Sequence, residues 1–97
     1  MPTLPKSIRF IVPKSGNKKY IAILPDGRRV AFGDRRYQHY ADKVPVRLGG
    51  GKWKKKDHKD AKRRANYRAR HRSVMKGRKP AYQVRYTPAW FSWYFLW

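Results

Sequence analysis

The stretch HKDAKRRANYRARH, from His58 to His71, holds most of the side chains that could carry chemistry. Six Lys or Arg lie between its two histidines, and Asp57 precedes it to form a DHKD motif that ends at Asp60. A histidine beside two carboxylates could support metal-dependent hydrolysis of nucleic acid. The same residues could equally form an arm for nucleic acid, or a helix packed against an acidic partner.

Catalysis has few other candidate groups. The chain has no cysteine, its serines lie in no nucleophile-elbow motif, and most of its five acids, all Asp, are placed where turns or helix caps use them. The stretch GGGK lacks the first glycine and the final Ser or Thr of a phosphate-binding loop. We therefore predict no enzymatic activity, small-molecule substrate, cofactor or metal. A nuclease at the DHKD motif is the minor alternative.

Charge is the strongest feature of the composition. The 97 residues carry a net charge of +21, and residues 52–79 contain fourteen Lys or Arg and two Asp, a local charge of +12. This density exceeds what solubility requires, so phosphate backbone or an acidic protein surface is the expected partner. Trp53 could stack on a base or serve as a packing anchor. The predicted contact residues are Lys52, Trp53, Lys54, Lys55, Lys56, Lys59, Lys62, Arg63, Arg64, Arg68, Arg70 and Arg72.

The elements that must position this region begin with three short strands. Apolar runs at 7–12, 18–24 and 28–33 alternate with polar residues, and Asp26-Gly27 between the last two is a strong hairpin signal. These patterns predict an antiparallel meander over residues 1–33. An irregular Gly/Lys-rich linker is expected at 34–56, with Gly49 to Gly51 as a flexible joint.

The remainder, 57–97, is predicted to hold a basic helix and an aromatic tail, packed with the meander into one compact α+β unit. The helix pattern favours Asp57 as N-cap, Asp60 as the second half of a capping box, and Gly77 as the stop after about residue 75 or 76. Residues 81–86 could be a strand or an extended arm. Thr87 and Pro88 then suit the start of a terminal helix.

The tail is apolar on all sides and too short to span a bilayer, so we predict no transmembrane segment. Its aromatics are expected to cover the sheet and the Tyr67 side of the basic helix, partly through cation–π contacts with arginines. His58 should pack near the helix start and His71 against Tyr67. The predicted structural or docking residues are His58, Asp60, Tyr67, His71, Trp90, Trp93 and Trp97.

Several of these pieces, in this order, resemble small uncharacterised proteins encoded by large DNA viruses of algae and amoebae and by some phages. The matching positions are Lys18, Lys19, Tyr20, Phe32, Gly33, His58, Lys59, Asp60, Tyr67, Arg70, His71, Ser92, Leu96 and Trp97. The segment between Gly33 and His58 is longer and more basic than the family pattern. The resemblance implies a virion setting and no established activity.

We thus expect a non-enzymatic structural component of a larger assembly. Its first expected partner is nucleic acid, bound without sequence specificity because no base-reading motif is present. The alternatives are a minor capsid protein that cements acidic capsid proteins and a ribonucleoprotein component.

Overall fold

The computed structural model describes residues 3–97. Strands β1 (Arg9–Ile11), β2 (Tyr20–Ile23) and β3 (Arg29–Phe32) form an antiparallel sheet in the order β1-β2-β3, which confirms the predicted meander. The Asp26 carboxylate accepts the Arg28 backbone N–H (3.0 Å) and so closes the predicted turn between β2 and β3. Each strand is shorter than its predicted range because only the central residues pair.

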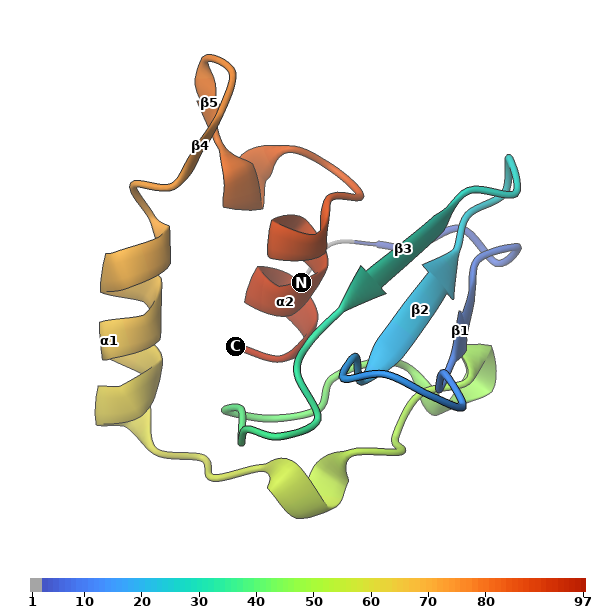
Figure 1. Cartoon of the computed structure of the whole chain (residues 1–97), viewed down its shortest axis with the longest axis horizontal. Coiled ribbons are helices and arrows are strands. Elements are labelled where there is room, and N and C mark those ends of the chain that lie inside the picture. Colours follow the sequence, from blue (N-terminus) through green and yellow to red (C-terminus); the bar gives the residue numbers. More distant parts are fainter. Residues whose placement is uncertain (1–2) are drawn as a thin grey trace.

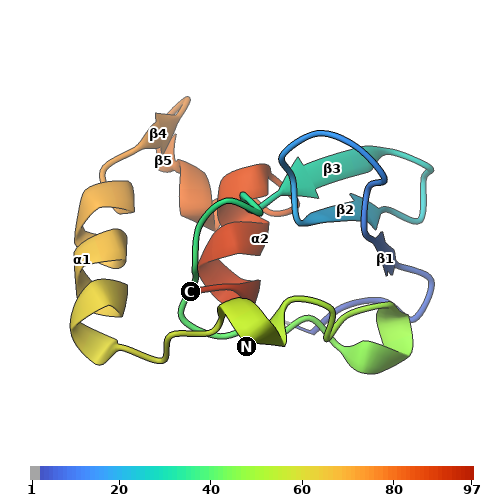
Figure 2. The ribbon, with the colours of Figure 1, turned by 60° about the horizontal axis from the view of Figure 1, so that its bottom comes forward.

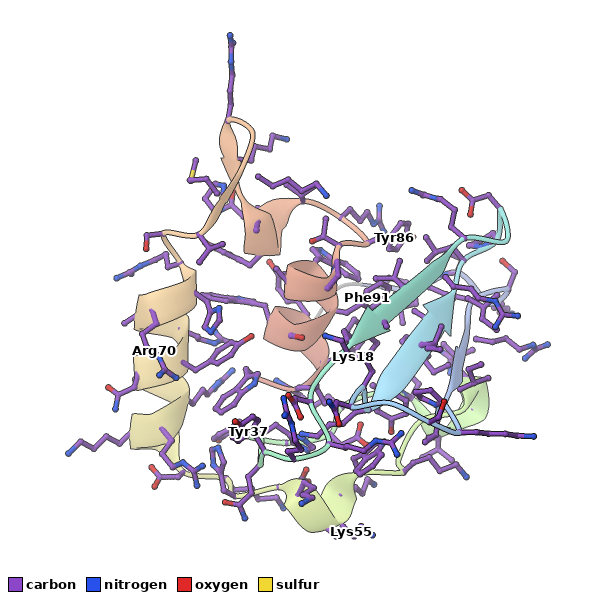
Figure 3. The ribbon with its side chains drawn as sticks, viewed as in Figure 1. Lys18, Tyr37, Lys55, Arg70, Tyr86 and Phe91 are labelled. Carbon is purple, nitrogen blue, oxygen red and sulfur yellow. The ribbon has the colours of Figure 1, made fainter. Side chains whose placement is uncertain are left out.

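The core lies between one face of this sheet and helix α2 (Pro88–Phe95). In the register, Phe10 lies opposite Ala22 and Tyr20 opposite Phe32, so large rings from all three strands share one face. The Phe91 ring stacks on Phe32 at a centroid distance of 5.1 Å, and Figure 3 shows Phe91 between α2 and β3. The Thr87 hydroxyl accepts the Trp90 N–H (3.2 Å), which confirms the predicted N-cap.

The segment between sheet and basic helix is irregular, as predicted, but the prediction of a flexible glycine joint is wrong. It contains two short 3-10 turns, η1 (Val46–Leu48) and η2 (Lys54–Lys56), and Val44 and Leu48 belong to the core. A Cβ on Gly49 would collide with the Phe10 carbonyl, and a Cβ on Gly50 with the Val44 carbonyl. The glycines are therefore used for close backbone packing.

The basic helix α1 (Ala61–His71) is shorter than predicted at both ends. Its N-cap is Asp60, whose carboxylate accepts the N–H groups of Lys62 and Arg63 at 2.9 and 3.1 Å. The prediction of Asp57 as N-cap and of a capping box is wrong, because the Asp57 side chain accepts a hydrogen bond from His39 instead. Asp60 keeps the structural role predicted for it.

Beyond α1 the chain turns back in a hairpin of β4 (Met75–Lys76) and β5 (Lys79–Pro80). Gly77, at φ +65°, belongs to this hairpin turn and is not a helix stop. The 3-10 turn η3 (Ala81–Gln83) replaces the strand or arm predicted for residues 81–86.

Helix α2 lies between the sheet and α1, so that the basic helix forms one outer side of the molecule and the β4–β5 hairpin projects beyond it (Figures 1 and 2). The radius of gyration is 12.9 Å, close to the roughly 13 Å expected for a folded chain of this length. Within residues 3–97, no helix is long and apolar enough to cross a membrane.

Candidate nucleic-acid interface

Helix α1 has no buried residue of its own and is held to the core by a stack of rings. Tyr67 lies between His71 and Trp97, at centroid distances of 4.2 Å and 4.1 Å. The predicted packing of His71 on Tyr67 is confirmed. Burial of the phenol raises the pKa of Tyr67 to about 12, so this phenol stays neutral over the physiological range.

Two arginines of α1 point into this junction. Arg64 and Arg68 both donate to the backbone oxygen of Trp97, at 2.8 and 3.2 Å. The Arg68 guanidinium lies 4.9 Å from the Trp93 ring centroid and that of Arg64 lies 4.7 Å from Tyr40. The predicted cation–π contact between tail and helix is thus confirmed. The same geometry gives Arg64 and Arg68 a docking role within the fold, and their assignment to the partner-binding surface stays a prediction.

Trp53 is half-buried and points inward, whereas its role in base stacking stays a prediction. Its indole N–H donates to the Lys19 carbonyl (2.8 Å), and its ring packs against the core. These contacts agree with the alternative of a packing anchor. Trp90 and Trp93 are buried, as their structural assignment predicted.

The other predicted contact residues carry their charge at or near the surface. Lys59, Lys62, Arg63, Arg70 and Arg72 are exposed along α1 and its start, Lys52, Lys54 and Lys55 are exposed around η2, and Lys56 is half-buried. Figure 3 shows Arg70 on α1 and Lys55 on η2 at the periphery of the molecule. The hairpin adds the exposed residues Lys76, Arg78 and Lys79, which were within the basic region but not among the predicted contacts.

Every acid of the described chain is already engaged within the fold. Asp26 pairs with Arg28 and Asp34 with Arg36, and the latter contact lowers the pKa of Asp34 to about 2. The other three carboxylates accept hydrogen bonds: Asp42 from Tyr20, Asp57 from His39, and Asp60 from the start of α1. In residues 3–97, the charge on the outer side of α1 is therefore uncompensated.

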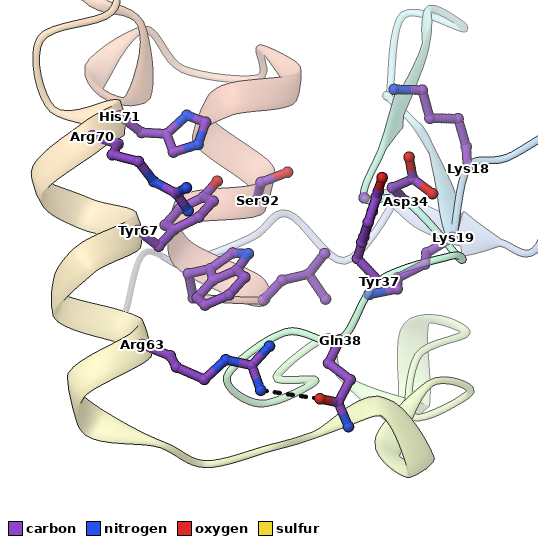
Figure 4. Close-up of a pocket in the computed structure, with 13 residues that line it drawn as sticks. Lys18, Lys19, Asp34, Tyr37, Gln38, Arg63, Tyr67, Arg70, His71 and Ser92 are labelled. Atoms are coloured by element: carbon purple, nitrogen blue, oxygen red, sulfur yellow. Dashed lines mark hydrogen bonds between the residues drawn. The ribbon is translucent and has the colours of Figure 1, made fainter.

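A cleft of about 480 Å³ opens beside α1 (Figure 4). Arg63, Arg70 and Lys18 bring positive charge to it, and Arg63 donates to the Gln38 side-chain oxygen (3.0 Å). Its apolar lining includes Tyr37, Tyr67, Leu96 and Trp97. Sequence reasoning missed Lys18, Tyr37 and Gln38 as site residues, because they come from loops whose position beside α1 has no local sequence signal.

A buried network of polar side chains begins at Lys19, which is one of the residues that line the cleft. Lys19 is 2% exposed, and its amine donates to Nδ1 of His39 (2.6 Å), while Nε2–H of His39 donates to Asp57 (2.6 Å). This is the arrangement in which His39 is neutral. Burial, with Lys56 nearby, lowers the pKa of Lys19 to about 8, and burial and Lys19 lower the pKa of His39.

A second buried pair fixes the basic segment around η2. The Tyr20 hydroxyl donates to Asp42 (2.6 Å) and accepts the Lys52 backbone N–H (2.9 Å), while Asp42 also accepts the Trp53 N–H (3.0 Å). The first residue of β2 thus ties down a segment 32 positions later. The sequence contains no motif that predicts this network or the network of Lys19, His39 and Asp57. Its only related feature is the run of two lysines and a tyrosine where β2 begins.

The DHKD motif is not assembled as a single site. Asp57 is bound to His39, and Nδ1 of His58 accepts the Asp60 backbone N–H (2.9 Å). The His58 ring lies 5.2 Å from that of Trp97, which agrees with the predicted packing near the helix start. Among residues 3–97, no group of three or more His, Cys, Asp or Glu could hold a metal ion.

The sheet-forming part of the chain is similar to a known family. Residues 8–45 match the model of a family of unknown function, DUF5754. This segment contains β1, β2, β3 and the chain up to Pro45, and it leaves out α1 and α2. No curated protein and no solved structure matches the chain.

Proposed function

We propose that this is a non-enzymatic, basic structural protein of a larger assembly that neutralises the phosphate backbone of nucleic acid without reading its sequence. The observation that carries the proposal is the exposed charge along α1. Lys62, Arg63, Arg70 and Arg72 are exposed, the two arginines of the cleft lining, Arg63 and Arg70, among them, and the acids of the described chain are occupied elsewhere.

Arginine supports this choice of partner, because its planar guanidinium forms paired hydrogen bonds with phosphate oxygens. Release of counterions from nucleic acid would supply most of the binding free energy. The partner also removes the self-repulsion that a net charge of +21 imposes on so small a chain. The virion location implied by the family resemblance stays a prediction.

The test is the salt dependence of binding to a short DNA duplex. Replacing Lys62, Arg63, Arg70 and Arg72 with Gln should weaken binding and flatten the log–log slope, by about 0.9 for each phosphate that the variant no longer neutralises. The matched control replaces four exposed cations away from α1, namely Lys6, Lys14, Arg29 and Arg47, and removes the same net charge. Its slope should stay near that of the unmodified protein.

Equal weakening in the two variants would show that total charge, not the α1 surface, determines binding. Polyglutamate serves as a second ligand. If it binds more tightly than the duplex at the same salt concentration, an acidic protein is the better partner.

A further inference from the structure

We propose that the cleft beside α1 holds an unpaired nucleotide of a single-stranded nucleic acid, with the base among the aromatic side chains and the phosphate on Arg63 and Arg70. This inference rests on the proposed function and names the form of nucleic acid that the site takes. It also gives the protein a contact to bases, which the outer cations alone do not provide.

The aromatic side chains of the cleft include one exposed ring, Tyr37, opposite a fixed stack of Tyr67 on Trp97. The Tyr67 and Trp97 rings lie within 4° of parallel, so Trp97 is fixed at one side of the cleft before any ligand arrives. Tyr37 lies across the cleft from Tyr67 (Figure 4), and 64% of it is exposed. A large aromatic this exposed gains little from the fold, whereas a base between the two sides would cover it.

The arginines of the cleft lie where they can bind the phosphate group of the nucleotide. Arg63 and Arg70 are seven residues apart, about two turns, so they share one side of α1. Figure 4 shows both side chains reaching from α1 toward the cleft, with Lys18 on the far side. Asp34 is the acid of the lining, and both of its oxygens are held by Arg36 (3.0 and 2.8 Å). It therefore opposes an anionic ligand only weakly.

A second hollow favours a single-stranded nucleic acid over a free nucleotide as the ligand. It is also about 480 Å³ and shares Arg63, Arg70 and Trp97 with the first, and it continues over Asn66 and Ala69. A chain can thus place one nucleotide in the cleft and run on along α1. A duplex would be a poorer ligand, because its base faces are covered by their neighbours in the stack.

The experiment compares three ligands of equal charge: an eight-residue oligothymidylate, the same strand with abasic sites, and an equally charged duplex. We expect the oligothymidylate to bind about tenfold more tightly than the abasic strand, since stacking on protein aromatics adds about this factor per base. Tyr37→Ala should remove most of that difference and leave the abasic strand unaffected. Tyr37→Phe, which keeps the ring, should bind like the unmodified protein. Val46→Ala, at another exposed apolar residue, is the control.

The outcomes separate the two proposals. Equal, salt-sensitive binding of the normal and abasic strands would overturn the nucleotide site and leave backbone neutralisation standing. Loss of the preference in Tyr37→Phe as well as Tyr37→Ala would overturn the stacking role. Thymidine monophosphate binding as tightly as the strand would overturn the assignment to a strand. Absence of binding to every nucleic acid would overturn the proposed function and this inference together.

Discussion

The Trp97 indole lies face to face with the Tyr67 ring, 4.1 Å away and within 4° of parallel. This stack joins the aromatic tail to a helix that buries no residue of its own. The Trp97 backbone oxygen also accepts hydrogen bonds from Arg64 and Arg68. Trp97 therefore contributes to both the apolar and the polar part of the α1 docking contact, beside the contacts of Arg68 with Trp93 and of Arg64 with Tyr40.

Trp97→Ala should loosen α1 without unfolding the sheet. The substitution removes the ring contact but leaves Phe91 and Phe95 in the core, so we expect a loss of roughly 2–3 kcal/mol, below the range for a fully buried aromatic because Trp97 is partly exposed. Hydrogen exchange should become faster at α1 amides and stay slow in β2. Retained protection of α1 would contradict the docking role of Trp97.

The elements that the sequence predicts well are those with local signals. The hairpin is predicted by Asp26-Gly27 and the terminal helix by Thr87-Pro88. Both signals are local, because each of these pairs determines the conformation of the backbone turn in which it lies. Asp57 and Asp60 show the limit of this reasoning. Both are plausible caps by type and spacing, but the carboxylate of Asp57 is engaged by His39, eighteen residues earlier, and by the backbone N–H of Asp42, fifteen residues earlier.

The sequence predicts which residue types make up the candidate site, but not which way each side chain points. The charge density singled out α1, yet Arg64 and Arg68 could not be told from Arg63 and Arg70 by type. Their orientation depends on where Trp93 and Trp97 lie, which is set by the packing of α2 on the sheet. A helix without a broad apolar face gives no sequence pattern that identifies its inner side.

Gly49→Ala should destabilise the fold strongly. Gly49 adopts φ +107°, and a Cβ there would meet the Phe10 carbonyl, so strain and overpacking add to roughly 2–5 kcal/mol in chemical denaturation. Gly16→Ala is the matched control: its φ is also positive, at +84°, but no atom lies within 4 Å of the added Cβ. It should be destabilised by only about 1–2 kcal/mol. Equal destabilisation would show that the close packing of Gly49 is unimportant.

Tyr20→Phe should release the basic segment around η2 from the sheet. Without the hydroxyl, the buried Asp42 carboxylate is deprived of a donor and the Lys52 N–H of its acceptor, which costs about 1–3 kcal/mol. Amide exchange at Lys52 should become faster. Tyr37→Phe, at an exposed ring, should change the stability by less than about 0.5 kcal/mol. A Tyr20→Phe protein as stable as the original would mean that the network does not hold this segment.

Stability should also fall as the pH drops from about 7 to 5, because His39 is held neutral. Its pKa is lowered by burial and by the Lys19 amine. Below the ordinary histidine pKa of about 6.5, the unfolded chain therefore binds a proton at this position that the folded chain does not, so protonation favours unfolding. The lowered pKa of Lys19, about 8, affects stability only at higher pH, and the lowered pKa values of Asp26 and Asp34 affect it only at lower pH.

His58 and His71 have lowered pKa values as well and act in the same direction, so the test must isolate His39. Urea unfolding at pH 7 and pH 5 gives the stability difference for each variant. His39→Gln should reduce that difference more than His71→Gln, because His39 is 0% exposed and next to an amine, whereas His71 is at the surface. An NMR titration of the unmodified protein should give a midpoint below about 6.5 for His39. A midpoint at that value would remove the contribution of His39 to the pH dependence, and a midpoint above it would mean that Asp57 outweighs burial and Lys19 and would reverse the sign of that contribution.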